Sequence, residues 1–202
     1  MSIQFRHKTS WKCFLAAAFA AVLTIQPGLA VERVFCVTNS YNGLPGATGN
    51  GTTDDTAAIQ RAFSAATNAF NSSDTAGYSG VAVVFPAGTY IISDRLKFVT
   101  TNFPPQGGGI TIRGVDTLRT VIQSTGSTGA FYFKLGGQRT ANKFLRLQIE
   151  DIKLFADSSP AGPAIEIEPD GTGMTLGIRP MLRNLHINRT TTANSYTYGI
   201  KL

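Results

Sequence analysis

The sequence is poor in several residue types on which common protein classes depend. Its 202 residues include two cysteines, two histidines and one tryptophan. Two cysteines exclude a disulfide-stapled scaffold and a cysteine-rich zinc site. Charged residues make up only 15% of the chain against 43% hydrophobic residues, a balance that excludes wholesale disorder. The longest apolar run is 13 residues, short of the roughly 20 that a membrane-spanning helix requires.

That apolar run, Cys13–Ile25, has the surroundings of a secretory signal. A Pro-Gly pair follows it, and the small residues Gly28 and Ala30 fit the −3 and −1 positions of a cleavage site after Ala30. The basic residues ahead of it are Arg6, His7, Lys8 and Lys12. We therefore expect residues 1–30 to be a cleaved signal peptide, with an uncleaved anchor as the alternative.

Removal of the signal changes the charge of the chain. Three of the 18 Lys and Arg residues lie in residues 1–30 and none of the 12 Asp and Glu residues does, so the net charge falls from +6 to +3. This mild charge permits an acidic polysaccharide as partner and gives no reason to expect nucleic acid or, after cleavage, a membrane. The remaining cysteine, Cys36, lies in the apolar run Val34–Val37, where we expect it to be buried.

One amphipathic helix follows a segment rich in turn residues, 39–51. Thr53 or Asp54 is placed to cap this helix. The apolar residues that recur with helical spacing are Ile59, Ala62, Phe63 and Ala66. We expect residues 31–80 to form an N-terminal cap that contains the helix.

Beyond the cap, residues 81–202 predict short strands with a weak repeat. The first strands expected are 81–85, 89–92 and 96–98. One strand then recurs at 109–114, 147–154 and 180–187. A second strand recurs at 130–133, 164–167 and 199–202. Neighbouring copies lie 33 to 35 residues apart in the later part of the chain, so a unit of two strands recurs about three times. Such spacing predicts a solenoid with parallel strand pairing. A β-sandwich is the alternative, because its short strands alternate in the same way.

The solenoid interpretation also predicts a column of core residues. Ile149, Ile152 and Leu154 would stack beneath Leu182, Leu185 and Ile187, one coil further along the chain.

Three segments resemble the pectate lyase superfamily of right-handed β-helix proteins. Residues 49–63, GNGTTDDTAAIQRAF, resemble its opening motif, residues 81–92, VAVVFPAGTYII, its next block, and residues 109–114 the strand that follows. The blocks occur in the family's order and spacing, and Asn50 departs from the usual Asp while keeping its turn preference. The resemblance spans about residues 34–202. It implies an all-β solenoid, a right-handed parallel β-helix with an N-terminal capping α-helix.

The resemblance further implies activity on polysaccharides, often uronates. Lyases of the family use calcium held by carboxylates and a basic residue as proton acceptor, whereas its hydrolases place carboxylates on both sides of the glycosidic bond. The hydrolase motifs Asn-Thr-Asp, Asp-Asp, Gly-His-Gly and Arg-x-Lys are absent after residue 100. Arg95-Leu96-Lys97 matches the last motif but precedes the expected region, so we interpret it as chance and assign no catalytic residue.

Two features that suggest catalysis are better explained as structural. Asp54 and Asp55 form the only Asp-Asp pair. Adjacent side chains on a helix point about 100° apart and do not converge on one bond, so we expect both residues to cap the helix. His186 lies between Leu185 and Ile187 and is expected on the outer, solvated face.

The remaining candidates are outward acidic and basic residues. Glu166 and Glu168 share one face of a strand, and with Asp170 they are placed to bind Ca²⁺, which takes 6–8 oxygen ligands. An ordinary solvated face is the alternative. The other acidic candidates are Glu150 and Asp157, the basic candidates for an acidic sugar are Arg189 and Lys201, and glycosylation sequons begin at Asn50, Asn71 and Asn188.

Three functions remain open. The first is an exported lyase or glycoside hydrolase of acidic, pectin-like glycans, and the second is a non-catalytic glycan-binding or adhesive β-helix. The third is an inactive fragment, because the chain stops at Leu202 inside a core-type strand and we expect the solenoid to be truncated there. A carboxylate or Arg/Lys constellation on neighbouring coils would favour the first.

The signal makes a direct prediction. When the chain is expressed in a secreting host, we expect the exported protein to begin at Val31 and to have lost residues 1–30. Intact-mass measurement of the purified product checks this. An exported product that retains residues 1–30 would contradict the assignment of a cleaved signal.

Overall fold

The computed structural model describes residues 32–72, 80–101, 108–136, 145–157, 161–169, 179–189 and 195–202. The expected signal peptide, residues 1–30, and the calcium candidate Asp170 lie outside these residues. Within the described residues there are one helix and twelve strands: β1 (Arg33–Cys36), β2 (Asn50–Asp54), α2 (Thr56–Asn71), β3 (Gly80–Val84), β4 (Gly88–Ile92), β5 (Leu96–Thr100), β6 (Gly108–Arg113), β7 (Thr120–Ser124), β8 (Phe131–Leu135), β9 (Leu145–Ala156), β10 (Pro163–Pro169), β11 (Arg179–Arg189) and β12 (Tyr198–Lys201).

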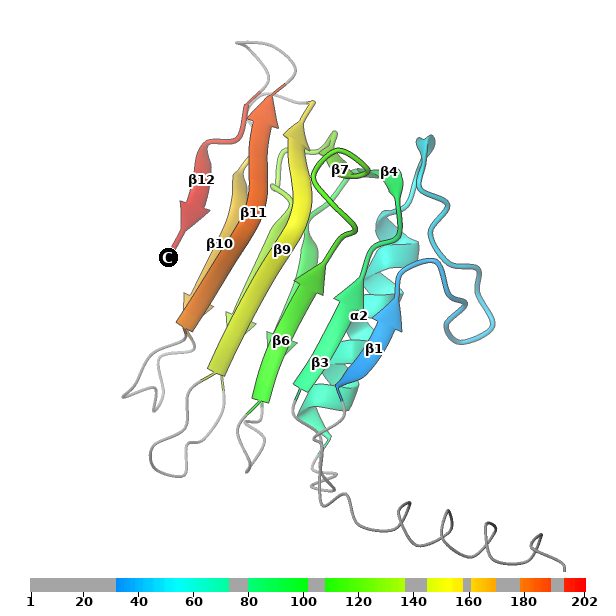
Figure 1. Cartoon of the computed structure of the whole chain (residues 1–202), viewed down its shortest axis with the longest axis vertical. Coiled ribbons are helices and arrows are strands. Elements are labelled where there is room, and N and C mark those ends of the chain that lie inside the picture. The colour runs from blue at the N-terminus through cyan, green and yellow to red at the C-terminus, as the bar shows by residue number, and fades with distance from the viewer. Residues whose placement is uncertain are drawn as a thin grey trace, which may run out of the picture. The chain divides into compact units, whose positions relative to one another are not determined.

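The strands pair in parallel with their equivalents in the next coil. One sheet runs in the order β1-β3-β6-β9-β7-β4-β2, with β11 paired to β9, and the other in the order β12-β10-β8-β5. Every pair of named strands is parallel. Figure 1 shows β1, β3, β6, β9 and β11 side by side. The fold is a parallel β-helix with an N-terminal helix, as predicted. The antiparallel sandwich is excluded.

The predicted repeat is confirmed by the register of the strands. Ile149 pairs with Leu182 at an offset of 33, Phe131 with Ile165 at 34, and Ile165 with Ile200 at 35. The predicted column is also present, because Ile152 pairs with Leu185 and Leu154 with Ile187. The predicted two strands per unit are present in the later coils, β9 with β10 and β11 with β12, whereas the coil before them has three strands and its middle strand, β7, was not predicted.

A residue in the left-handed conformation divides β9 into two halves that pair with different strands. Asp151 has φ +59° and Asn184, its equivalent in β11, has φ +46°, a conformation that Asp and Asn adopt more readily than other non-glycine residues. Before Asp151, β9 pairs with β6; after it, β9 pairs with β7. Asn184 Nδ2 donates to Asp151 Oδ1 over 2.8 Å, which links the corners of two coils.

Helix α2 closes the N-terminal end of the core with aromatic contacts. Phe63 is fully buried, and its ring stacks on Phe131 with centroids 6.0 Å apart. It also meets Phe85 and Phe98 edge-on at 6.3 and 6.4 Å. One helical side chain therefore joins several strands of the solenoid. Cys36, expected to be buried, is half-buried, because it projects from the outer side of β1.

The helix also covers a sheet edge. Gln60 donates from Nε2 to the Lys97 carbonyl over 2.9 Å and accepts from the Lys97 N–H over 2.8 Å. Asn71 accepts from the Thr101 N–H over 3.1 Å. These side-chain amides take the place of a neighbouring strand on the free edge of β5, where unpaired backbone groups would invite association with another chain.

The packing of Phe63 predicts a large effect on stability. We expect Phe63→Ala to lower the free energy of unfolding by about 3–5 kcal/mol, because the cavity left by the ring cannot be refilled. Urea unfolding followed by circular dichroism measures the change. Ser64→Ala, at the exposed neighbouring position, is the matched control and should change stability by about 0.5 kcal/mol at most. Equal losses in both variants would contradict this account.

Candidate functional site

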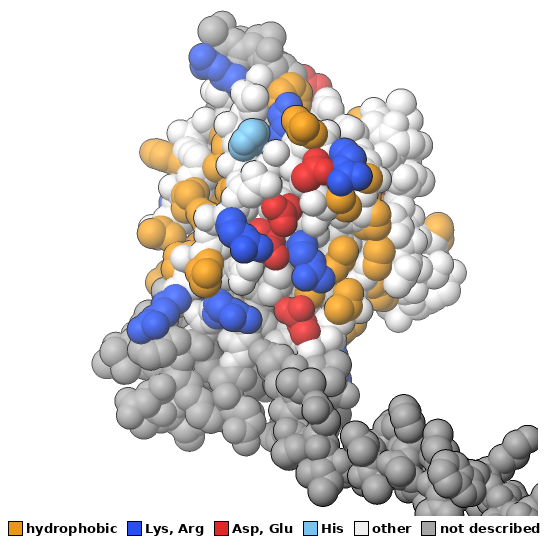
Figure 2. Space-filling view, viewed as in Figure 1, with side chains coloured by type: hydrophobic (Ala, Val, Ile, Leu, Met, Phe, Trp, Pro, Cys, Tyr) orange, Lys and Arg blue, Asp and Glu red, His pale blue; other side chains and the backbone are white. Residues whose placement is uncertain are grey.

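The outer face of β6, β9 and β11 carries a set of charged residues in register. Ile110, Ile112, Leu147 and Ile149 of these strands point into the core, so the residues between them point outward. Arg113 of β6, Glu150 of β9 and Arg183 of β11 are direct neighbours in one row, and Arg146 and Arg179 are neighbours in another. We call these four arginines, together with Glu150, the arginine face. Figure 2 views the molecule from the side of these strands and shows basic side chains gathered around acidic ones.

Glu150 is the centre of the arginine face. It is 4% exposed. Its Oε2 atom accepts hydrogen bonds from Arg183 Nη2 at 2.6 Å and from Gln148 Nε2 at 2.7 Å. The Arg183 side chain is 69% exposed. A buried carboxylate is thus held by a cation that also reaches the surface.

Two of the other arginines, Arg113 and Arg146, add positive charge to this face. Among the described residues, no acidic side chain pairs with Arg113 or Arg146. Arg146 lies over Gly109 of the preceding coil, where a Cβ would come within 3.2 Å of its Nε atom. Arg113 and Arg146 thus add positive charge to the face beyond the pair of Glu150 with Arg183. Guanidinium groups bind carboxylates in a bidentate manner, so this surface suits a ligand that carries carboxylates.

Neighbouring coils place like charges together on this face. Arg146 and Arg179 occupy paired positions, and like charges directly opposite one another on adjacent strands are destabilising.

The predicted acidic candidates Glu166 and Glu168 lie on another face. Glu166 of β10 accepts from Arg95 Nη1 at 2.8 Å and from Lys201 Nζ at 2.7 Å, and the hydrogen bond with Glu166 raises the pKa of Lys201. Glu168 accepts from the Tyr132 hydroxyl. Both glutamates are outward, as predicted, but cations and a hydroxyl occupy their oxygens. Within the described residues no group of three or more His, Cys, Asp or Glu side chains is placed to hold a metal ion.

The remaining candidates are dispersed. Asp157 accepts from Gln123 Nε2 at 2.9 Å. Arg189 and His186 are exposed on β11. Arg95 lies 4.1 Å over the Tyr132 ring, and Lys97 pairs with Asp94, a surface network that fits the interpretation of Arg95-Leu96-Lys97 as a chance match.

The Asp54–Asp55 pair has the structural role predicted, with one correction. Asp54 accepts from the Thr56 N–H at 2.9 Å at the start of α2 and from the Ser93 hydroxyl at 2.6 Å. Asp55 was expected to cap the helix with its side chain, but its buried carboxylate instead accepts from the N–H groups of Thr48 and Gly49 at 2.7 and 3.0 Å. The polar loop that precedes β2 has backbone donors that compete for Asp55.

Sequence reasoning named Glu150 and missed the arginines around it. Arg146 and Arg179 are 33 residues apart, the same offset that relates Glu150 to Arg183. The signal that could have found them is therefore the repeat offset itself, applied to charged residues as well as to apolar ones.

The comparison with protein families settles the relationship. Residues 45–201 match the family model described as rhamnogalacturonase A/epimerase, pectate lyase-like. The chain belongs to this family. Its members are pectate lyase-like proteins, so the chain is related to proteins that act on polysaccharides. Neither a curated protein nor a solved structure gave a significant match. Over the described residues, no helix is both long and apolar enough to cross a membrane.

The contacts of Asp54 predict a pH-dependent contribution to stability. Partial desolvation acts to raise the pKa of the Asp54 carboxyl, but hydrogen bonds from Ser93 and Thr56 together lower it below its usual value. The stabilisation is therefore complete above the unfolded pKa of about 3.9 and is lost as the pH falls through the lower, folded pKa.

We expect Asp54→Ala to cost about 1 kcal/mol or less at pH 7, because the carboxylate is exposed, and to cost less in acid. Urea unfolding of both proteins at neutral pH and at about pH 3 measures the two differences. A difference between the proteins that stays constant over this range would show that the carboxylate charge has no part in the cap.

Proposed function

We propose that the protein is exported and acts on an acidic, pectin-like polysaccharide that binds along the arginine face. The single observation that carries this proposal is the register of four arginines with one buried glutamate on neighbouring coils. Successive coils are about 4.8 Å apart, so the guanidinium groups form an array along the solenoid. A polymer with a carboxylate on each sugar unit would meet several of these groups at once.

The arrangement favours elimination over hydrolysis. Hydrolysis with two carboxylates requires an acid and a base on opposite sides of the glycosidic bond. In the described part of the arginine face only Glu150 is acidic. In elimination, a base takes the proton next to the sugar carboxylate while positive charge stabilises the electrons that move onto that carboxylate. A C=C bond then forms as the glycosidic C–O bond breaks, and the leaving sugar oxygen takes a proton from water. Arg113 and Arg183 would supply the charge.

Glu150 is the proposed proton acceptor. Arg183 and Gln148 both bind Oε2, and no described residue donates to Oε1, which is left to accept the proton. Ca²⁺ is proposed as an accessory cation whose ligands would come partly from the substrate carboxylates, because the described residues offer no complete set.

A non-catalytic, adhesive β-helix is the second candidate. The observation that favours it is that Glu150 is already engaged by Arg183, so the face is able to bind a polyanion without any chemistry.

We expect Arg113→Gln and Arg146→Gln each to weaken binding of polygalacturonate about tenfold, because each removes charged hydrogen bonds to a carboxylate. Affinity electrophoresis or calorimetry at low and high salt measures this. Lys134→Gln on β8 removes the same charge from another sheet and should change affinity by about twofold at most. Equal losses of affinity in Lys134→Gln and the arginine variants would show that the loss reflects net charge alone.

The reaction is tested separately from binding. The absorbance of unsaturated products, which Glu150→Gln should abolish while binding is retained, indicates the lyase. Reducing ends without this absorbance would indicate a hydrolase and contradict elimination. Binding without either product on a panel of acidic glycans would establish the adhesive alternative. Failure to bind any acidic glycan would overturn the proposal. EDTA tests the calcium requirement.

A further inference from the structure

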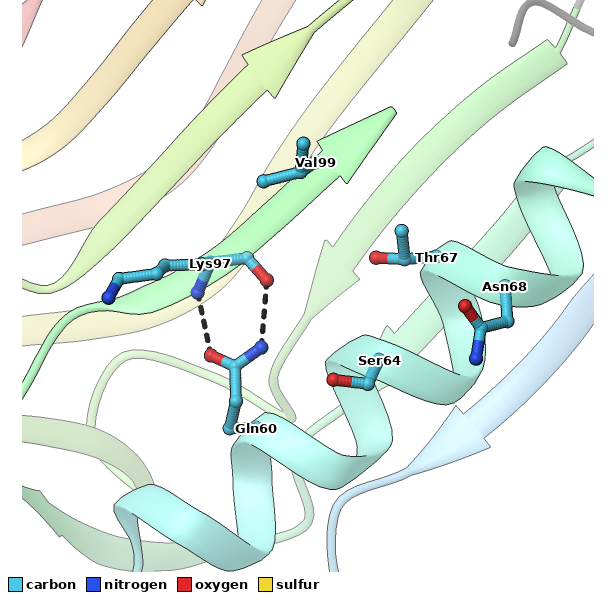
Figure 3. A pocket seen from close by; sticks show the side chains of 6 residues that line it. All are labelled: Gln60, Ser64, Thr67, Asn68, Lys97 and Val99. Atoms are coloured by element: carbon cyan, nitrogen blue, oxygen red, sulfur yellow. Dashed lines mark hydrogen bonds between the residues drawn. The ribbon is translucent and has the colours of Figure 1, made fainter. Parts of the chain in front are cut away.

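A second feature with the geometry of a binding site lies between α2 and β5, on a sheet that does not carry the arginine face. It is a groove of about 180 Å³ lined by Gln60, Ser64, Thr67, Asn68, Lys97 and Val99. Figure 3 shows that Ser64, Thr67 and Asn68 border it from the helix and that Val99 borders it from the strand. Pockets for drug-sized ligands are several hundred cubic ångströms, so this groove suits a much smaller molecule.

The strand side of the groove has an unpaired backbone donor. Leu96 N–H donates to Ala130 of the neighbouring coil, and Thr100 accepts from Gly136, so the alternate residues Lys97 and Val99 direct their backbone groups toward α2. Gln60 satisfies both backbone groups of Lys97. Among the described residues nothing accepts from the Val99 N–H. The replacement of the missing strand is therefore incomplete at one position.

The helix side has an unpaired hydroxyl. Thr67 Oγ1 is shielded from solvent and has no hydrogen-bond partner, an arrangement that costs free energy and is rare in native proteins. Threonine in a helix populates two rotamers, and rotation about χ1 exchanges its hydroxyl with its methyl group. A ligand in the groove would stabilise the rotamer that turns the hydroxyl toward it.

The chemistry of the lining indicates an uncharged, hydroxylated ligand. Val99 offers a donor, whereas a threonine hydroxyl, a serine hydroxyl and the Asn68 amide each both donate and accept. Lys97 is the only charged lining residue, and its Nζ atom is 3.5 Å from Asp94 Oδ2. Val99 is 37% exposed and its side chain supplies an apolar surface. A ring with hydroxyl groups on its edge and C–H groups on its face matches these groups.

We propose that the groove between α2 and β5 binds a single neutral sugar ring, separately from the arginine face. The ring places one hydroxyl against the Val99 N–H and the Thr67 hydroxyl and places its C–H face on Val99. Such a ligand has about a dozen non-hydrogen atoms, which corresponds to a dissociation constant of about 1 mM.

The test is saturation-transfer NMR on the full chain with methyl glycosides of glucose, galactose, rhamnose and arabinose as probes. We expect saturable transfer to at least one of them. Ser64→Phe fills the groove from an exposed helix position and should weaken binding at least about tenfold. Ala57→Phe, at an exposed position of the same helix outside the groove, is the matched control and should leave binding unchanged. Urea unfolding verifies that both variants fold.

Thr67→Val tests the hydroxyl, because it preserves shape and removes only the unpaired oxygen. It should weaken binding without loss of stability. A soluble neutral galactan, tested beside methyl galactoside, distinguishes a branch of a polysaccharide from a free sugar, and binding of either supports the proposal. No saturable binding of any probe, or equal binding by Ser64→Phe and the unchanged chain, would overturn it and leave a groove that holds ordered water only. Neither result depends on the arginine variants, so the two proposals fail separately.

Discussion

The pairing of each strand with its equivalent one coil away is the constraint on which the rest of the structure depends. A parallel ladder joins residues at a fixed register, so whatever one coil presents, the next presents directly beside it. On the inner side this register stacks Ile112, Ile149 and Leu182 into one apolar column. On the outer side the same register brings arginines from strands far apart in sequence onto one surface. Core and candidate site therefore follow from a single geometric rule.

In the first coil β3 and β4 pair with β1 and β2, but within the described residues β5 has no strand on its N-terminal side, and α2 takes that place. An unprotected sheet edge exposes both apolar side chains and unpaired backbone groups. Phe63 covers the apolar part, and the Gln60 amide makes the two hydrogen bonds to the Lys97 backbone that a neighbouring strand would otherwise make. This replacement does not extend to the Val99 N–H, since a helix cannot present amide side chains at the two-residue interval of a strand. The groove between α2 and β5 thus arises because the side chains of a helix and those of a strand repeat at different intervals.

The parts of the fold that were predictable from sequence are those that repeat. The offsets of 33 to 35 residues identified the solenoid and its register, because an inward position must stay apolar in every coil. Strand β7 was missed because its sequence, TVIQS, is too short to show a pattern without its neighbours. The role of Asp55 in binding the preceding loop was not predictable either, since it depends on N–H groups that approach only after folding. Glu150 was recognised as an isolated acid, but its burial depends on Arg183 and Gln148, which reach it from the next coil and from the same strand.

The left-handed corner at Asp151 and Asn184 keeps the outward side chains regularly spaced on the surface. Because the chain turns there within one residue, the strand segments on either side remain aligned from one coil to the next. The position of a side chain on this part of the surface is therefore set by two quantities, its coil and its place along the strand. A step of one repeat along the chain moves it about 4.8 Å along the axis, and a step of two residues moves it about 6.7 Å across the face. Single substitutions can therefore change the charge pattern of this surface while the backbone stays the same.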